Sequence, residues 1–168
     1  GIVRYAEHFD PYYRDLLEEK GLTGELVTSF RYVLLMSRQC PLAEKERISF
    51  DDLRDYIEIA HADPYVPSLP LSEVKKEELP DVDRRIFIFE RGSQFDLLSQ
   101  NPATFMWVSP LSERLLDRFG LVQRVCPENV KQYRDVMIFH KDYTPTELDR
   151  LFIAELNRVK QEIFHAPQ

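Results

Sequence analysis

The sequence lacks any long hydrophobic run. Its longest stretch of consecutive apolar residues, Tyr32–Met36, has five residues, whereas a helix needs about 18 or more to cross a bilayer. A basic segment followed by an apolar one is also missing from its start, so nothing in it indicates a secretory signal. We therefore expect a cytoplasmic protein that does not associate with membranes.

Cysteine and glycine are scarce as well. The chain has two cysteines, Cys40 and Cys126, which are 86 positions apart, and five glycines against eleven prolines. So few cysteines are typical of free thiols in a reducing compartment, with an oxidised pair as the alternative. The excess of proline over glycine predicts ordered turns rather than flexible linkers.

Positive charge is in deficit. Lys and Arg number 22 against 29 Asp and Glu, which gives a net charge of −7. Because proteins that bind nucleic acid present a basic face to the phosphates, this chain alone is not expected to bind DNA or RNA. Its 168 residues, 43% of them apolar, are enough for about one domain with a core of its own.

What the sequence does contain is an alternation of strand and helix patterns. The predicted strands are 2–5, 25–37, 57–61, 85–90, 104–109, 121–125 and 135–140. The predicted helices are 10–19, 50–56, 72–79, 93–100, 110–119 and about 145–163. Strands that alternate with helices of this length predict an α/β fold with a mostly parallel or mixed sheet flanked by helices.

Residues that favour helix N-termini precede several of these helices. Ser49, Ser93 and Ser109 are each expected to cap the helix that follows. The segment Thr144–Glu147 is predicted to form a capping box with proline at the first helical position, and Gly120 is expected to end a helix.

Three strand-to-helix junctions are expected to lie at one edge of the sheet. They are His61–Tyr65, Arg91–Gln94 and Ser109–Pro110. In open α/β sheets, ligands bind beyond the carboxyl ends of the strands. Two junctions place a serine at a helix N-terminus, where free N–H groups favour an anion. The sequence therefore predicts a crevice for a small anionic ligand, either a carboxylate or a phosphate.

His61 and Asp63 form the pair that most resembles a catalytic site. Residues two apart on an extended segment point to the same side, so both could bind a metal or polarise a water. No second motif has the spacing of metal ligands, and neither a nucleophile elbow nor a glycine-rich phosphate loop occurs. We expect no metal, no cofactor and no enzymatic activity, with solvated loop residues as the simplest interpretation of the pair.

Three further residues have two interpretations each. Phe105 and Trp107 belong either to the core of a central strand or to a wall of the crevice. Arg4 ends a short apolar strand, and either binds a ligand carboxylate through two parallel hydrogen bonds or forms an ordinary salt bridge.

Five segments, taken in order, carry a family resemblance. They are Tyr32–Ser37, Cys40–Ala43, Ile48–Leu53, Glu90–Phe95 and Phe105–Pro110. Their order and spacing resemble the effector-binding domain of LysR-type transcriptional regulators. The second segment begins with cysteine where the family usually has histidine, and the last has bulkier residues than the usual Gly-Ile-Ala before its proline.

This resemblance extends from Gly1 to Phe164 and implies a type II periplasmic-binding-protein-like fold. In that fold, two subdomains are joined by two crossing strands and a small effector binds between them. The resemblance implies a remnant of the first subdomain at 1–31, a complete second subdomain at 32–138, and a return strand and helix at 139–168. The opening strands of the first subdomain are expected to be missing.

The resemblance also implies partners. The chain is expected to bind a small effector, to contact DNA only through a separate domain, and to self-associate through apolar helix faces. The candidate effector-binding residues are Arg4, Tyr5, Ala60, His61, Asp63, Ser93, Gln94, Phe105, Trp107 and Ser109. Two alternatives are a stand-alone small-molecule binding protein of the same fold and a metal-dependent hydrolase that uses His61 and Asp63.

Overall fold

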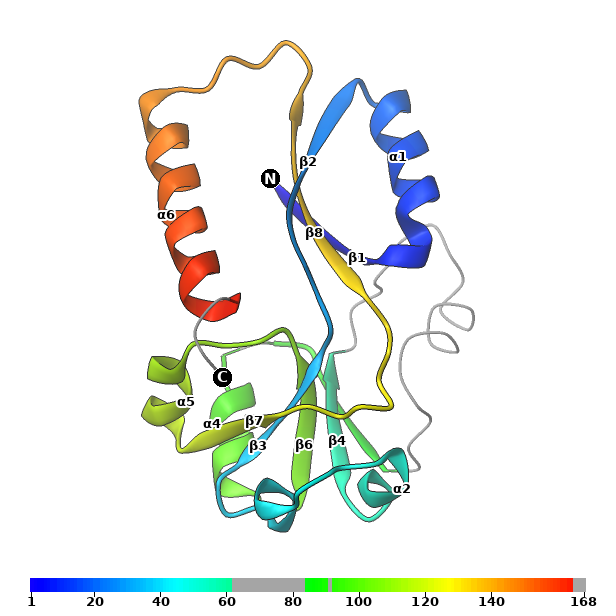
Figure 1. The fold of residues 1–168 in the computed structure, drawn as a ribbon, viewed down its shortest axis with the longest axis vertical. Helices are drawn as coiled ribbons and strands as arrows, with labels where there is room; N and C mark the ends of the chain where they lie inside the picture. Colours follow the sequence, from blue (N-terminus) through cyan, green and yellow to red (C-terminus); the bar gives the residue numbers. More distant parts are fainter. Residues whose placement is uncertain (62–83, 91, 165–168) are drawn as a thin grey trace. The chain divides into compact units, whose positions relative to one another are not determined.

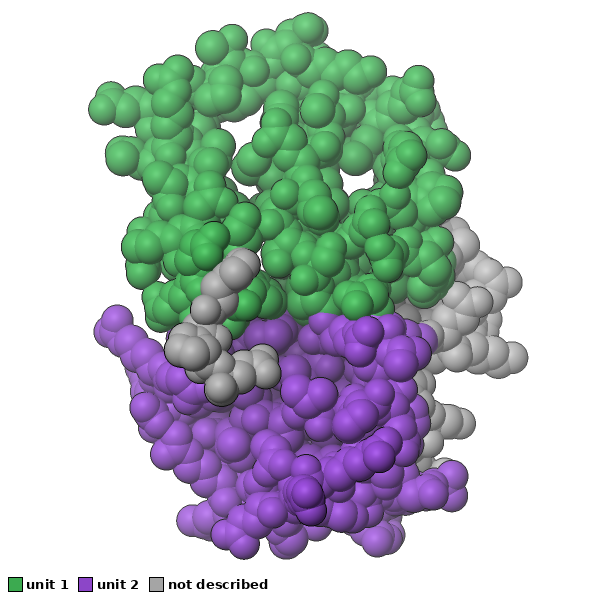
Figure 2. Space-filling view, in the orientation of Figure 1, with its two compact units in different colours: residues 1–30, 132–168 green, residues 31–131 purple. Residues whose placement is uncertain are grey.

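The structure is a computed structural model that describes residues 1–61, 84–90 and 92–164 (Figure 1). The helix predicted at 72–79 and the candidate residue Asp63 lie outside the described residues. The chain divides into two units, shown in different colours in Figure 2. Unit 1 contains residues 1–30 together with the chain from 132 onward, and unit 2 contains residues 31–131.

Unit 1 is built on a three-stranded antiparallel sheet in the order β1-β8-β2. Its strands are β1 (Ile2–Ala6), β2 (Leu22–Phe30) and β8 (Tyr133–His140). The short helix η1 (Glu7–Phe9) leads into α1 (Asp10–Glu19). After β8 the chain forms α6 (Glu147–Phe164), which Figure 1 shows beside the strands.

Helix α1 follows the local signals in the sequence. It begins at Asp10 with Pro11 in its first turn, and the chain leaves it through Gly21, whose φ is +65°. The side chain of Leu17 in α1 lies close to Gly24 of β2. A Cβ on Gly24 would lie 2.9 Å from Cδ1 of Leu17, so a larger residue would force that side chain to shift.

Unit 2 is built on a five-stranded mixed sheet in the order β5-β4-β6-β3-β7. The strands are β3 (Val33–Ser37), β4 (Ile57–His61), β5 (Arg85–Ile88), β6 (Thr104–Val108) and β7 (Leu121–Arg124). Strand β4 runs parallel to β5 and to β6, whereas β3 is antiparallel to β6 and β7. The helices are η2 (Pro41–Glu44), α2 (Phe50–Leu53), α4 (Gln94–Gln100) and α5 (Glu113–Phe119).

The apolar core of unit 2 lies between one face of this sheet and helices α4 and α5. It consists of buried residues from strands and helices: Leu35, Ile59, Leu98, Met106, Leu116 and Leu121. Phe105 and Trp107 alternate with Met106 along β6 and therefore point to the opposite face. There Trp107 packs edge-on against Phe50 of α2, with ring centroids 6.4 Å apart.

The predicted strand 25–37 is wrong as a single element. The structure has two strands, β2 in unit 1 and β3 in unit 2, interrupted at Arg31 and Tyr32. The backbone oxygen of Tyr32 accepts a hydrogen bond of 3.3 Å from the side-chain amide of Asn129 rather than from a strand neighbour. A continuous apolar run carries no signal for the point at which a chain passes from one sheet to another.

The predicted helix 110–119 begins three residues too early. Helix α5 starts at Glu113, after Ser112. The side chain of Gln123 binds both backbone groups of Leu111, with Oε1 accepting from N at 2.9 Å and Nε2 donating to O at 3.3 Å. These two hydrogen bonds use the backbone groups of Leu111 outside the helix, and the N-cap of α5 is Ser112 rather than Ser109.

Other helix boundaries need smaller corrections. The capping box of Ser49 and Asp52 is present, but α2 ends at Leu53 rather than at Tyr56. The cap of α6 is Thr146, whose backbone N donates to Asp149 at 2.8 Å and whose hydroxyl accepts from the backbone of Asp149 at 3.3 Å. The predicted box at Thr144–Glu147 is therefore two residues too early. Strand β5 ends at Ile88 rather than at residue 90.

Candidate ligand site

The carboxyl ends of three strands of unit 2 meet at one edge of its sheet. Strand β4 is parallel to both β5 and β6, with His61 level with Ile88 of β5. Ala60 and His61 end β4, Glu90, Gly92 and Ser93 follow β5, and Ser109 follows β6. The structure therefore brings together the described residues of the three junctions that the sequence places at one edge. We call these residues the strand-end edge.

His61 and the start of α4 lie on the same face of the sheet. Ile59 packs in the core beneath α4 and α5, and His61 is two residues further along the strand, so its side chain points to that face. His61 is partly buried, as is Gln94 at the first position of α4.

Glu90 makes the densest set of contacts at the strand-end edge. Its carboxylate accepts hydrogen bonds from the backbone N of Gly92 at 2.5 Å and from that of Ser93 at 3.2 Å. The hydroxyl of Ser93 donates to the same carboxylate. The hydroxyl of Ser93 and these two N–H groups stabilise the ionised form and hold the pKa of Glu90 below its usual value.

Ser93 therefore plays a different part from the one predicted. It precedes α4, but its side chain makes no capping hydrogen bond, and its backbone, at φ −92° and ψ 0°, is not extended as an N-cap usually is. Its hydroxyl is turned toward Glu90 instead. Sequence reasoning missed Glu90, although an acid two residues before a Gly-Ser pair is a signal that could have identified it.

The side-chain oxygen of Gln94 lacks a hydrogen-bond partner among the described residues. This atom, Oε1, is buried. The indole Nε1 of Trp107 is in the same condition within that part of the chain. Buried polar atoms normally have partners, so Oε1 of Gln94 could accept a hydrogen bond from a bound molecule and Nε1 of Trp107 could donate one.

Phe105 and Trp107 are core residues of unit 2. Phe105 is 0% exposed and Trp107 is 7% exposed, and their rings meet edge-on with centroids 6.4 Å apart. The interpretation of these residues as strand core therefore fits their burial better than the interpretation as an open wall.

Arg4 and Tyr5 lie in unit 1, where both have partners. Arg4 binds Asp135 of the neighbouring strand through Nε at 2.7 Å and through a second guanidinium nitrogen at 2.8 Å. Tyr5 is buried, stacks on Tyr13 with centroids 4.1 Å apart, and donates its hydroxyl to Asp10 at 3.0 Å. Burial and this hydrogen bond raise the pKa of Tyr5 to about 12.

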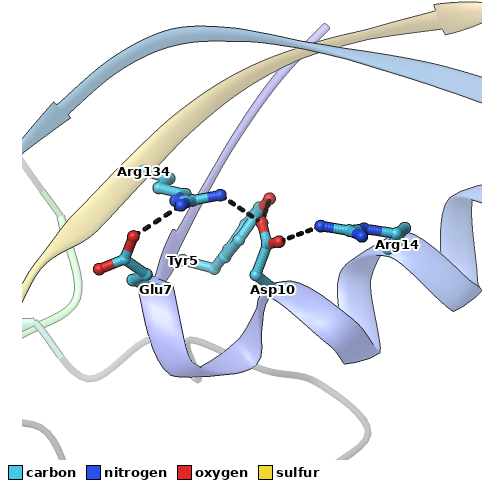
Figure 3. Close-up of polar contacts among 5 residues, drawn as sticks. All are labelled: Tyr5, Glu7, Asp10, Arg14 and Arg134. Atoms are coloured by element: carbon cyan, nitrogen blue, oxygen red, sulfur yellow. Dashed lines mark hydrogen bonds and ion pairs between the residues drawn. The ribbon is translucent and has the colours of Figure 1, made fainter.

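Asp10 is the centre of a polar network that joins α1 to β8 (Figure 3). Besides Tyr5, its carboxylate accepts hydrogen bonds from Arg14 at 2.7 Å and from Arg134 at 2.9 Å, and Arg134 also binds Glu7 at 2.6 Å. Burial alone would raise the pKa of Asp10. The hydrogen bonds from Tyr5 and Arg14, with the charges of Arg134 and Arg14, outweigh burial and lower that pKa below its usual value.

Unit 1 also contains a cavity of about 660 Å³ between its strands and α6. Its lining includes Ile2 of β1, Phe139 of β8 and Phe152 of α6. None of the candidate residues from the sequence lines this cavity, and the strand-end edge of unit 2 does not contribute to it.

The described residues contain neither a cluster of metal ligands nor a helix that could span a membrane. Across residues 1–61, 84–90 and 92–164, no group of three or more His, Cys, Asp or Glu side chains is arranged to hold a metal ion. Within the same ranges, every helix is too short or too polar to span a bilayer.

This chain is similar to solved structures, whereas family models and curated sequences do not match it. No family model matches the sequence. No curated protein matches it either. The regulatory domain of the LysR-family regulator MetR from N. meningitidis matches with a TM-score of 0.57 and 13% identity, over 97% of this chain and 72% of that one.

Two further matches are structures of complexes. The effector-binding domain of QuiR in complex with shikimate has a TM-score of 0.55 and 16% identity, over 89% of this chain and 76% of that one. The regulatory domain of CcmR from Synechocystis PCC6803 in complex with 2-PG has a TM-score of 0.56 and 18% identity, over 94% and 72%. This chain has the fold of LysR regulatory domains.

The type II periplasmic-binding-protein-like fold predicted from the sequence is therefore confirmed, with a mixed sheet and flanking helices. The neighbours are regulatory domains and not enzymes. The chain spans 64% of the length of one other regulator chain that it matches and 49% of another.

Proposed function

We propose that this chain is the effector-binding domain of a LysR-type transcriptional regulator and senses a small metabolite. The observation that carries the proposal is the strand-end edge of unit 2, where three parallel strands end together in a chain with the fold of LysR regulatory domains. Polar groups converge at this edge, and in open α/β sheets ligands bind beyond the carboxyl ends of the strands.

The effector is proposed to be a small organic anion. The donors at the strand-end edge are the hydroxyl of Ser93 and the N–H groups of Gly92 and Ser93, which bind Glu90 in this structure. The imidazole of His61 is a further side chain there that can donate a hydrogen bond. Two proteins of this fold were solved with shikimate and 2-PG, both of which are organic acids.

Contacts are assigned to the candidate residues of unit 2. At or beside the strand-end edge these are Ala60, His61, Ser93, Gln94 and Ser109, and Asp63 is a candidate outside the described residues. Phe105 and Trp107 remain candidates, although they point to the face of the sheet opposite to His61. Arg4 and Tyr5 remain candidates from unit 1. Because Arg4 already forms a bidentate pair with Asp135, it would contact an effector only by giving up at least one of those hydrogen bonds.

In this proposal, units 1 and 2 correspond to the two subdomains predicted from the sequence, which were 1–31 with 139–168, and 32–138. Residues 132–138 belong to unit 1 and not to unit 2. An effector that binds one arrangement of the subdomains more tightly shifts the population toward it. DNA would be bound by a separate domain, since this chain has a net charge of −7. We also propose that this chain self-associates and that the protein is located in the cytoplasm.

A thermal-shift panel tests the function. It contains shikimate, 2-phosphoglycolate, amino acids and sugar phosphates, with zinc and a chelator alongside. At 100 times its dissociation constant, a ligand adds about 2.7 kcal/mol to the free energy of unfolding, which raises the melting temperature by a few degrees. We expect one chemical class of organic acid to stabilise the chain.

The variants His61→Ala and Ser93→Ala should lose that stabilisation. The matched control is Ser99→Ala, because Ser99 lies near the other end of the same helix and binds the backbone oxygen of Asp96. Stabilisation that persists in both variants, or that zinc alone produces, would contradict the proposed site.

A further inference from the structure

The sheet of unit 1 has a different helix against each of its faces. Ile2, Met137 and Glu25 lie opposite one another across β1, β8 and β2, so their side chains point to the same face. A Cβ at Gly24 would point to the other face, toward Leu17 of α1. The face that contains Met137 is therefore the one that borders the cavity with α6.

Helix α6 contacts the sheet near the C-terminal end of the helix. There Nζ of Lys160 donates to the backbone oxygen of Val27 at 3.2 Å, and the ring centroids of Phe164 and Phe30 lie 6.0 Å apart. Toward the N-terminal end of α6, the helix and the sheet border the cavity of about 660 Å³. A cavity of this volume is in the range of pockets that hold small organic molecules.

The walls of the cavity are apolar and partly open to solvent. They include side chains from β1, β8 and α6, namely Ile2, Met137, Phe139, Phe152 and Ile153. Ile2 is 44% exposed and Phe152 is 53% exposed. Because apolar surface is more stable away from water, an apolar molecule that covers these side chains gains free energy.

Two carboxylates line the cavity, and they differ in their contacts. Asp149 accepts hydrogen bonds from the hydroxyl of Tyr143 at 2.6 Å and from the backbone N of Thr146 at 2.8 Å. Glu25 is exposed, and its carboxylate has no hydrogen-bond or ion-pair partner among the residues that the structure describes. Glu25 is therefore the carboxylate that is open to a positively charged group in the cavity.

The positive groups in the lining already have partners. The amino group of Gly1 donates to the backbone oxygen of Ile138 at 2.8 Å, and Nδ1 of His140 lies 3.8 Å from a carboxylate oxygen of Asp142. The charge of Glu25 repels an anion in the cavity and attracts a cation. The lining therefore favours a cationic ligand over an anionic one.

We propose that this cavity binds a small apolar amine, with its apolar part against Met137 and Phe152 and its ammonium group beside Glu25. The site belongs to unit 1 and not to the strand-end edge of unit 2, so it goes beyond the proposed function. Because the ligand contacts both α6 and the sheet, it holds the N-terminal part of the helix against the strands.

Nuclear magnetic resonance of the methyl-labelled full chain tests the site through the signals of Met137 and Ile153. Three probes share a phenyl group and differ in charge: 2-phenylethylamine, 2-phenylethanol and phenylacetate. Because an exposed ion pair is a weak interaction, we expect the amine to bind about threefold more tightly than the alcohol. Phenylacetate should bind more weakly than the alcohol.

Two variants separate the charge from the apolar wall. Glu25→Gln should lower the affinity of the amine to that of the alcohol and leave the alcohol unchanged. Its control is Glu19→Gln, because Glu19 is an exposed acid of α1 outside the lining. Phe152→Ala should weaken the amine and the alcohol about fivefold. Its control is Leu151→Ala, because Leu151 is an exposed neighbour that does not line the cavity.

The proposal is overturned if no probe shifts the signals of Met137 and Ile153, or if the amine and the alcohol bind the unmodified chain equally. It is also overturned if Glu25→Gln keeps the preference for the amine. Light scattering tests a second copy of the chain as the occupant: a dimer that excludes the probes and that Phe152→Ala separates contradicts an amine site. If circular dichroism shows that Phe152→Ala does not fold, the comparison of Glu25→Gln with its control decides.

Discussion

The two units bury their apolar residues to different extents. In unit 2, the strand residues Leu34, Leu35 and Met36 are all 0% exposed. In unit 1, helix α6 contains no buried residue within its described length, and Leu148 and Leu151 on it are 75% and 62% exposed. Unit 2 is therefore held together by a closed apolar core. Unit 1 depends more on its strand pairing and on polar contacts between strands and α1.

The polar groups differ in the same way. In unit 1, the charges of Asp10, Arg134 and Glu7 satisfy one another and join a helix to a strand. At the strand-end edge of unit 2, Glu90 binds an exposed turn. The first arrangement joins a helix to a strand, whereas the second stays within one short segment at the edge where our proposal places the effector.

The largest expected effect on the free energy of unfolding comes from truncating a buried apolar side chain rather than an exposed one. Leu98→Ala in the core of unit 2 should lower the free energy of unfolding by about 2–5 kcal/mol, because it leaves a cavity beneath α4. Leu151→Ala on the exposed face of α6 should change it by about 0.5 kcal/mol or less. Urea denaturation followed by circular dichroism measures both. Similar losses would show that α6 is covered in solution.

The polar network of unit 1 should have an intermediate effect. Asp10→Asn removes the ion pairs with Arg14 and Arg134 and should cost about 1–2 kcal/mol. The pKa of Asp10 is lower in the folded chain than its usual value of 3.8. Its stabilisation is therefore present above about pH 4 and is lost as the pH falls through the folded pKa.

The measurement is the free energy of unfolding of both proteins across this pH range. Their difference should be constant near neutral pH and should shrink in acid. A difference that does not change with pH would mean that the charge of Asp10 contributes nothing and that only its shape matters. Tyr5→Phe is the companion variant, because it removes the hydroxyl that donates to Asp10. It should also remove the titration of Tyr5, whose pKa is raised to about 12.

The smallest expected effect concerns Arg4. Arg4→Ala breaks the pair with Asp135, and because Arg4 is partly exposed the cost should be about 0.5–1 kcal/mol. The loss should shrink in high salt, which screens exposed ion pairs. If Arg4 instead contacts the effector, the variant will also weaken the ligand found in the thermal-shift panel. An unchanged affinity would assign Arg4 to the fold alone.

Local features of the structure were predictable where their cause lies within a few residues. Helix α1 has the predicted bounds, and the capping box of Ser49 and Asp52 is present because both partners are three positions apart. Gly120 ends α5 with φ +62°, as a glycine in that position should. The order of such segments was enough to indicate the fold class.

The candidate site was predictable only in part. The meeting of β4, β5 and β6 at one edge followed from the alternation of strands and helices. The role of Ser93 did not, because its hydroxyl could equally have capped α4. The start of α5 was misplaced because Gln123, twelve positions away from Leu111, binds the backbone groups of that residue outside the helix.

The sequence by itself determined the helix signals, the strand alternation and hence the class of fold, since these arise from neighbours along the chain. Only the tertiary structure decided which sheet each half of 25–37 joins, and that Arg4 binds Asp135, which is 131 positions away. The physical reason is that a side chain binds whichever partner folding brings near. A local pattern specifies the backbone of a segment but not the distant group that its side chains will meet.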